Sequence, residues 1–338
     1  MSSNRLARRA PEFVPQCNVS LLLEPRYYPA LHNLIQLSLY DCGLQSLAGI
    51  EQSNDRLEPL FPKLDSLDLG RNPKLTNDSI PETFHTQFPQ LTQLWLDDCA
   101  LGAHIPSTLL ELSTLRVVRI TGNKLEGELE DGIGIRYWRE LKVLALDGNK
   151  LTSVGRGIGF MKYLEKLHLR GNALEALPEG VPSSRNTSLN LISLSSNKLT
   201  SLPDSLVEAV SLKELYLNQN QIDFLPEGLA DKLWGIDKLN LAHNNIGKGM
   251  NLTAGSQNST DGDDVFMEDA LSDTLPKDFV DRFGMPDLSG NCTKDDSAVV
   301  RLEGNPLANL IRKRHLDEEN RRAKRKAMEM AMETELIE

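Results

Sequence analysis

Hydrophobic positions in the stretch 141–174 follow one eleven-residue pattern twice. The pattern is LxxLxLxxNxL, and its named positions are held first by Leu141, Leu144, Leu146, Asn149 and Leu151, then by Leu164, Leu167, Leu169, Asn172 and Leu174. The alternating leucines predict a short strand, and the asparagine predicts a turn, because its amide both donates and accepts hydrogen bonds. One copy cannot bury its own apolar side, so copies must stack.

The same pattern can be placed ten times along the chain of 338 residues. Successive copies lie 23 to 30 residues apart, except for a last step of 61 residues that must contain an insertion. Ten strands about 4.8 Å apart would form a sheet roughly 43 Å along its arc, long enough for a protein-sized partner. The asparagine position, here called the ladder position, is held in order by Cys42, Asn72, Cys99, Asn123, Asn149, Asn172, Asn197, Asn220, Asn244 and Asn305.

This spacing resembles that of the leucine-rich repeat superfamily. The resemblance implies an α/β solenoid, or horseshoe, of about ten repeats with a parallel concave sheet. Residues 99–129 resemble the plant receptor type of repeat, with their Leu-x-Gly and Ile-Pro phrases. The phrases LEALPEG, LTSLPDSL and IDFLPEGL at 174–180, 199–206 and 222–229 resemble the eukaryotic intracellular class, called Ras-group-related in plants. We expect Leu144, Leu167, Leu194 and Leu215 to share one row beneath neighbouring strands.

Composition along the chain predicts three parts. Residues 1–12 are basic and polar and form a disordered tail, 13–310 form the solenoid, and 311–338 form a charged C-terminal helix, since they lack glycine and proline. Within the solenoid, 13–33 serve as an N-terminal cap. Residues 247–296 are an acidic insertion in the last repeat, with 11 Asp/Glu and 4 Lys/Arg, or 4 − 11 = −7 of the chain's net charge of −11.

The C-terminal helix suggests two further properties. Its seven-residue spacing of Leu316, Ala323, Met330 and Ile337 gives weak support for self-association. The run RRAKRK at 321–326 matches a nuclear import signal, and it also matches the solvated face of a charged helix.

Cysteine usage indicates a reducing compartment, because Cys42 and Cys99 lie two repeats apart, about 9.6 Å, too far for a disulfide. We therefore expect a cytoplasmic protein, with the nucleus as the other intracellular possibility. No apolar run reaches the roughly 20 residues of a membrane span. Six N-x-S/T sites point the other way, toward secretion, but are common by coincidence in a chain rich in asparagine. They are Asn18, Asn77, Asn186, Asn251, Asn258 and Asn291.

Outward-facing positions of the predicted sheet are the candidate partner-binding residues. Aromatic residues and arginines on an exposed strand face have no core to fill, and they are the residue types enriched at interface hot spots. The alternative is that these side chains only pair with one another across strands, at about 0.2 to 1 kcal/mol per pair. The candidates are Tyr40, Trp95, Asp97, Arg119, Asp147, His168, Arg170, Tyr216 and Asn218.

Catalysis has one candidate constellation, since Asp147, His168 and Ser193 fall on adjacent predicted strands. A flat sheet offers neither a nucleophile elbow nor an oxyanion hole, and GxSxG is absent, so we expect no enzyme activity. The sequence also lacks GxxxxGK[ST], HExxH and a cysteine cluster, and DGDD at 261–264 is no full calcium loop. We expect no cofactor and no metal.

The sequence therefore favours a non-enzymatic protein-binding scaffold, in the signalling or regulatory assemblies that the family resemblance implies. A secreted or receptor-like protein is the first alternative, and an enzyme using the Asp147, His168 and Ser193 trio is the second. Partners should be proteins of unknown identity, with no membrane contact. Nucleic acid is not expected, because the sequence pI is about 5.2 and the candidate face reads as uncharged to acidic.

Overall fold

The computed structural model describes residues 28–51, 58–129, 137–226, 236–247, 291–292 and 299–308, together with residues 133, 229 and 323. The predicted tail, most of the predicted cap, nearly all of the acidic insertion and the C-terminal helix lie outside these residues. The predictions made for those segments therefore stay predictions.

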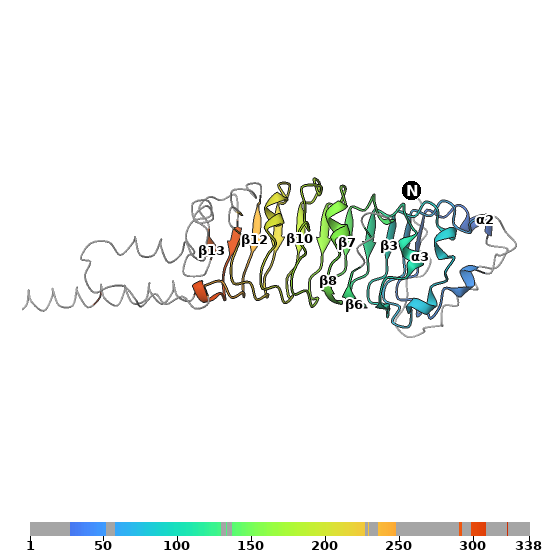
Figure 1. Cartoon of the computed structure of the whole chain (residues 1–338). Helices are drawn as coiled ribbons and strands as arrows, with labels where there is room; N and C mark the ends of the chain where they lie inside the picture. Colours follow the sequence, from blue (N-terminus) through green and yellow to red (C-terminus); the bar gives the residue numbers. More distant parts are fainter. Residues whose placement is uncertain are drawn as a thin grey trace, which may run out of the picture.

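Short parallel strands stack side by side along the molecule (Figure 1). Each strand ends four residues before a ladder position, where the alternating leucines predict it. The parallel strands are β1 (Gln36–Ser38), β2 (Ser66–Asp68), β3 (Gln93–Trp95), β5 (Val117–Arg119), β7 (Val143–Ala145), β9 (Lys166–His168), β10 (Leu191–Ser193), β11 (Glu214–Tyr216), β12 (Lys238–Asn240) and β14 (Val299–Arg301). The short β13 (Asn291–Cys292) pairs antiparallel with β14 and completes an 11-stranded sheet.

The central residue of each strand points into the molecule and forms a row with its neighbours. Leu144, Leu167 and Leu215 belong to this row and are at most 2% exposed. Its member from β10 is Ile192, which pairs with Leu167 on one side and Leu215 on the other. The expectation that Leu194 belongs to this row was wrong, because Leu194 lies two residues further along and outside the strand.

A ladder of asparagines, most of them buried, connects successive repeats. The Nδ2 of Asn149 donates to the carbonyls of Ile120 (2.8 Å) and Leu146 (2.9 Å), and its Oδ1 accepts from the N–H of Leu125 at 3.1 Å. One side chain therefore satisfies polar backbone groups of two repeats. The same arrangement recurs at Asn72, Asn172, Asn197, Asn220, Asn244 and Asn305.

Where cysteine takes the ladder position, part of this bonding is replaced. The Cys99 thiol donates to the carbonyl of Leu69 at 3.4 Å. The N–H of Leu75 in the preceding repeat bonds to the carbonyl of Asn72 at 2.9 Å. Cys42 and Cys99 are both buried, and burial raises the pKa of the Cys99 thiol to about 11.

The residue just before each ladder position has a positive φ, between 53° and 72°. Glycine adopts this conformation without strain, as at Gly148, which has φ of 65°. Several repeats hold a residue with a side chain there instead, among them Arg71 and Gln219. These residues carry a conformational cost that the surrounding stack must offset.

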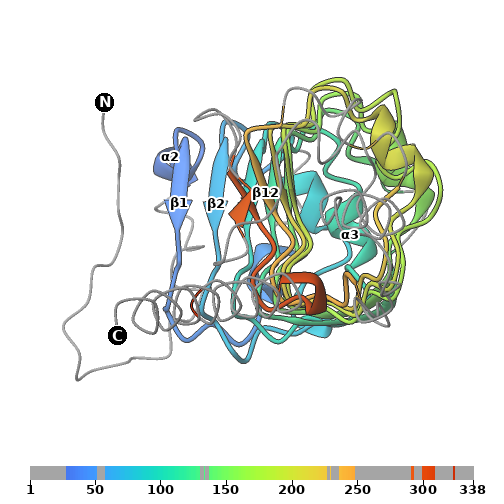
Figure 2. The ribbon, with the colours of Figure 1, turned by 90° about the vertical axis from the view of Figure 1, so that its left-hand side faces the viewer.

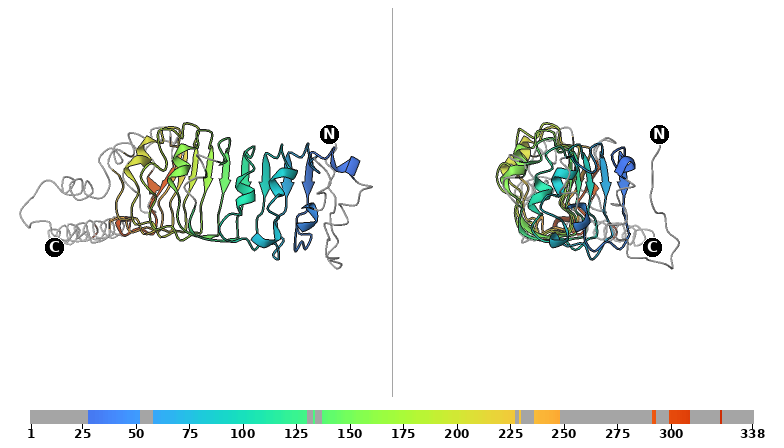
Figure 3. Two further views of the ribbon diagram at one scale, coloured as in Figure 1. Left: turned by 45° about the vertical axis from the view of Figure 1, so that its right-hand side comes forward. Right: turned by 90° about the vertical axis from the view of Figure 1, so that its right-hand side faces the viewer.

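Opposite the sheet, the chain returns through short helical turns. Viewed along the stack, the strands β1, β2 and β12 lie on one side and α3 on the other (Figure 2). Figure 3 shows from two further sides that the strands stack next to one another along the molecule. The helical elements are α2 (Tyr28–Leu31), α3 (Ser107–Leu110), and the 3₁₀ turns η2 (Ala48–Glu51), η3 (Asn77–Ser79), η4 (Phe84–Gln87), η6 (Arg156–Phe160) and η7 (Asp204–Glu208).

A second parallel sheet follows the ladder in three central repeats. It contains β4 (Gly102–Ala103), β6 (Lys124–Glu128) and β8 (Lys150–Ser153). The register between β6 and β8 shifts at Gly127 and Glu128, as in a β-bulge. This sheet arises within and just after 99–129, where the sequence changes repeat type.

The core is one continuous stack of leucines between the strands and the helical turns. Phe61 and Phe88 stack with ring centroids 5.1 Å apart, and Phe84 packs against Phe88 at 4.6 Å. Trp138 is fully buried, and its indole N–H donates to the carbonyl of Leu109 at 3.2 Å. Because the leucines occupy the interior, polar residues of the strands are left facing outward.

Candidate protein-binding surface

The outward side of the 11-stranded sheet, here called the strand face, carries a row of side chains in strict register. The row lies one residue after the buried row, so its side chains point away from the core. Backbone pairing places its members side by side, and they are Ser38, Asp68, Trp95, Arg119, Ala145, His168, Ser193, Tyr216, Asn240 and Arg301.

All nine candidate residues have solvent-accessible side chains. Tyr40, Arg119 and Arg170 are exposed, and the other six are half-buried. Trp95 is half-buried between fully buried Leu94 and Leu96, so its indole belongs to the strand face. Some small residues expected on this face are covered by their neighbours, namely Ala145 (5% exposed), Ser195 (4%) and Ala242 (3%).

Asp97 joins two repeats on the strand face. Its Oδ2 accepts from Nε of Arg119 at 3.0 Å. Its Oδ1 accepts from the N–H of Thr121 at 3.0 Å and also from the Thr121 hydroxyl. The carboxylate therefore holds the Arg119 side chain by one edge of the guanidinium, beside Trp95 on the next strand.

His168 lies among several charged groups at the centre of the face. Asp147 does not bond to it, because the Asp147 Oδ1 accepts from the backbone N–H of Arg170 at 2.6 Å. Burial lowers the pKa of His168, partly opposed by the Asp147 charge, and burial raises the pKa of Asp147. Within the described residues, no hydrogen bond links His168 to Asp147 or Ser193. The trio lacks the connected nucleophile, base and orienting group of covalent catalysis.

Tyr216 belongs to a smaller network further along the face. Its hydroxyl donates to Glu214 Oε2 at 2.6 Å, and Lys238 Nζ donates to Glu214 Oε1 at 3.1 Å. The hydrogen bond to the carboxylate raises the pKa of Tyr216 to about 12 and lowers the pKa of Glu214. Two residues after the paired Ser193 and Tyr216, the Ser195 hydroxyl donates to Oδ1 of Asn218 at 2.6 Å.

Tyr40 forms the N-terminal end of the described face. Its ring lies over Gly70, where an added Cβ would be 3.1 Å from Cδ2 of the tyrosine. The Arg71 guanidinium carbon is 6.0 Å from the ring centroid, within cation–π range. A hydrogen bond with Tyr40 raises the pKa of Arg71.

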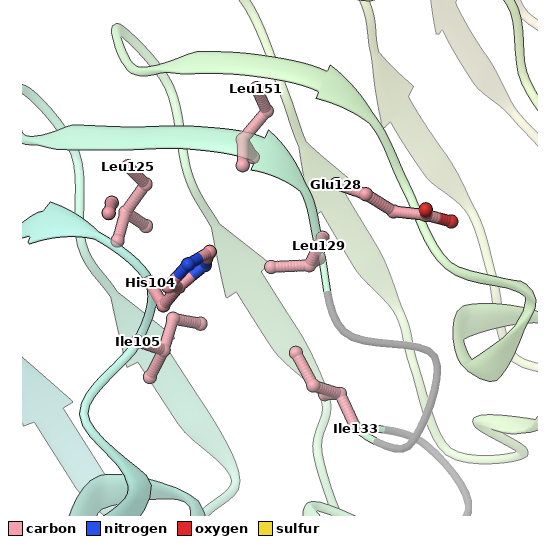
Figure 4. Close-up of a pocket in the computed structure, with 8 residues that line it drawn as sticks. His104, Ile105, Leu125, Glu128, Leu129, Ile133 and Leu151 are labelled. Atoms are coloured by element: carbon pink, nitrogen blue, oxygen red, sulfur yellow. The ribbon is translucent and has the colours of Figure 1, made fainter.

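A pocket of about 380 Å³ lies on another flank, beside the second sheet (Figure 4). Leucine and isoleucine side chains form most of its wall, and Glu128 extends away from them. Four of these apolar side chains, those of Leu125, Leu129, Ile133 and Leu151, are at most 3% exposed and already belong to the core. The pocket lining is Ala103, His104, Ile105, Leu125, Glu128, Leu129, Ile133 and Leu151.

Two of the six N-x-S/T asparagines have structural roles. Asn186 is 2% exposed, and its Nδ2 donates to the carbonyls of Ile158 (2.9 Å) and Met161 (3.0 Å). The Nδ2 of Asn77 donates to the carbonyls of Gly102 and His104, both at 2.9 Å. A glycan at Asn186 is incompatible with this packing.

The described residues offer neither a membrane span nor a metal site. Within that part of the chain, no helix has the length and apolar character to span a bilayer. In the same residues, no group of three or more His, Cys, Asp or Glu side chains is placed to hold a metal ion.

Comparison with known proteins places this fold in a class of solenoids. A family model described as "Leucine rich repeat" matches residues 162–222 and 187–246. Together with the parallel sheet and the asparagine ladder, this match shows that the chain folds as a leucine-rich repeat solenoid. The comparison with curated proteins found no match.

Solved structures with the same fold include two plant receptors and one bacterial protein. The plant peptide hormone receptor RGFR1, in complex with RGF2, aligns with a TM-score of 0.50 and 21% identity over 63% of this chain and 33% of its own. The LRR ectodomain of the receptor kinase GASSHO1/SCHENGEN3 from Arabidopsis thaliana, in complex with CASPARIAN STRIP INTEGRITY FACTOR 2, aligns with a TM-score of 0.50 and 25% identity. This alignment covers 62% of this chain and 27% of the ectodomain chain. An internalin, InlF from Listeria monocytogenes, aligns with a TM-score of 0.53 and 18% identity over 68% of this chain and 58% of the internalin chain.

These alignments cover about a third or less of either plant receptor chain. At 18% and 21% identity, the internalin and RGFR1 alignments show the fold alone.

The sequence predicted which residues face outward on the sheet, but not that the carboxylates of Asp97 and Asp147 accept hydrogen bonds from backbone N–H groups of the next repeat. The regular offset of 23 to 24 residues between each aspartate and its donor is the signal that could have indicated it.

Proposed function

We propose that this chain is a non-enzymatic scaffold that binds a protein partner on its strand face, in intracellular signalling or in the assembly of regulatory complexes. The observation that carries the proposal is the in-register row across β1 to β14, which presents Trp95, Arg119, His168 and Tyr216 outward. Leucines fill the interior, so the stack does not need these large side chains for its core. Aromatic residues and arginine dominate interface hot spots.

Two observations support an intracellular site of action. The buried Cys99 carries a free thiol, as is usual in a reducing compartment. Asn186, one of the potential glycosylation sites, is packed inside the solenoid. Fluorescent tagging of the full chain tests this location, and a cytoplasmic or nuclear signal is expected.

A receptor-like or secreted protein is the alternative. The fold match to the GASSHO1/SCHENGEN3 ectodomain, which was solved in complex with CASPARIAN STRIP INTEGRITY FACTOR 2, favours it. So does the second sheet, which begins in the segment that resembles plant receptor repeats. Expression in a secretory host separates the two proposals, since secretion with glycan attached would favour the alternative.

The binding proposal is tested by proximity labelling with the full chain, followed by pull-down of the labelled partners with variants. Trp95→Ala and Arg119→Ala should each lower recovery at least about tenfold, the size expected of a hot spot. Matched controls are Phe224→Ala, an aromatic side chain 65% exposed outside the sheet, and Arg185→Ala, whose guanidinium lies over Phe160. If recovery survives both strand-face changes, these two residues are not the binding site.

Catalysis by the Asp147, His168 and Ser193 trio has its own test. A fluorophosphonate probe should leave Ser193 unlabelled, because no hydrogen bond joins the serine to the histidine within the described residues. Labelling of Ser193 that disappears in His168→Ala would contradict the non-enzymatic proposal.

A further inference from the structure

Carboxylates on the strand face are turned toward the protein itself. Asp68 Oδ1 accepts from the N–H of Gly70 at 3.0 Å. Asp97 accepts from Arg119 and Thr121, and Asp147 accepts from the N–H of Arg170. Their capacity to attract a cationic partner is therefore partly used within the stack.

Hydrogen-bond donors on the same face are left open. Between β3 and β9, the described structure gives no hydrogen bond to the Trp95 indole N–H, the Lys166 ammonium, the His168 ring or the Arg170 guanidinium. Arg119 uses only Nε, which leaves both of its terminal nitrogens to solvent. An indole N–H or a guanidinium without a partner is a ready donor for a hydrogen-bond acceptor.

Charge on this part of the face differs from that of the chain. Counting the outward positions of β3, β5, β7 and β9 and the residues two places after each strand, the cations are Arg119, Lys166 and Arg170, and the anions are Asp97 and Asp147, so the sum is 3 − 2 = +1. The whole chain carries −11. Exposed Asp98, at the rim over Gly122, brings this sum to 0, so the central part of the face is uncharged overall while the chain as a whole is acidic.

We propose that the strand face between β3 and β9 binds an acidic peptide segment of a protein partner. This inference rests on the function proposed above and specifies the chemistry of the partner. Carboxylates of the segment would accept hydrogen bonds from the terminal nitrogens of Arg119 and from the Arg170 guanidinium, both of which suit planar two-oxygen acceptors. The Trp95 indole N–H adds a donor on the adjacent strand.

The spacing of the two arginines restricts the peptide. The strands of Arg119 and His168 lie two apart, about 9.6 Å, and Arg170 lies two residues beyond His168 at the end of β9, about 6.8 Å further along the chain. These offsets combine to roughly 12 Å between Cα atoms, which an extended chain spans in about three to four residues. Acidic residues three or four positions apart are therefore expected.

The test begins by panning a phage-displayed random dodecapeptide library on the immobilised full chain. Enriched peptides should contain pairs of Asp or Glu at that spacing. Their affinity, measured by fluorescence anisotropy, should fall at least about tenfold for the double variant Arg119→Gln/Arg170→Gln, and it should weaken as salt is raised. Arg185→Gln, which removes a guanidinium away from the strand face, is the matched control and should leave affinity unchanged.

The outcomes separate this inference from the proposed function. Peptides that lose binding with Trp95→Ala but are neutral or basic would overturn the acidic-partner inference and leave strand-face binding intact. Peptides that ignore every strand-face variant, or a library that yields no binder, would count against both. Tighter binding of a fluorescent single-stranded oligonucleotide, lost in the double variant, would assign the donors to nucleic acid instead.

Discussion

Replacement of Asn220 by alanine should destabilise the solenoid through one specific loss. The Asn220 side chain is 7% exposed and makes three hydrogen bonds, accepting from the N–H of Leu199 and donating to the carbonyls of Leu194 and Leu217. Each carbonyl keeps a second bond, from Asn197 at 2.9 Å and from Asn244 at 3.0 Å. Only the N–H of Leu199 is left unpaired in the interior.

This accounting gives the magnitude. A buried donor without an acceptor costs about 1–3 kcal/mol, and two further lost bonds add about 0.5–1 kcal/mol each, so Asn220→Ala should lower the free energy of unfolding by about 2–5 kcal/mol. Urea unfolding followed by circular dichroism measures the change, provided that the slope against denaturant is unchanged.

The matched control is Asn245→Ala in the next repeat. Asn245 donates one bond, to the carbonyl of Gln221 at 3.3 Å, and its side chain is partly exposed. Its removal should change the free energy of unfolding by no more than about 0.5 kcal/mol. A loss below about 1 kcal/mol for Asn220→Ala, or equal losses for the two variants, would refute the reasoning that the ladder stabilises the stack.

Three further predictions concern backbone conformation and ionisation. Gly148→Ala, at φ of 65°, should lower the free energy of unfolding by about 1–2 kcal/mol, while Gln219→Gly, at 59°, should be nearly neutral; the reverse order in urea unfolding would contradict the strain argument. Native Cys99, whose pKa is about 11, should resist iodoacetamide at pH 8 and react in guanidinium, as read by peptide mass spectrometry; rapid native alkylation would be the opposite result. The Tyr216 bond should stabilise the fold below pH 10 and weaken as pH rises through about 12, so Tyr216→Phe should remove a late-ionising tyrosine from the ultraviolet titration, and an unchanged curve would disprove this.

Leucine periodicity predicted the strands well because burial of alternate residues leaves few other registers. The misplacement of Leu194 shows the limit of that signal. Residues 189–194 offer apolar side chains at Leu189, Leu191, Ile192 and Leu194. Because the other members of the row are leucines, Leu194 was assigned to it in place of Ile192. Backbone pairing with β9 and β11 selected Ile192.

The charge of the strand face was harder to predict than its position. Asp97 and Asp147 both point outward, as alternation requires, but their hydrogen-bond donors belong to the next repeat. A count of charges by position cannot show that a carboxylate is already engaged. The second sheet was missed for a similar reason, since β4 is only two residues long and pairs with a strand from the following repeat.

The most direct test of the account places a photo-crosslinking amino acid at position 168, in the middle of the strand face, and at position 185, away from the sheet, in two versions of the full chain. Irradiation in cells should join the partner to position 168 and leave position 185 without a specific product. A partner captured from position 185 alone would show that the strand face is not where this protein binds.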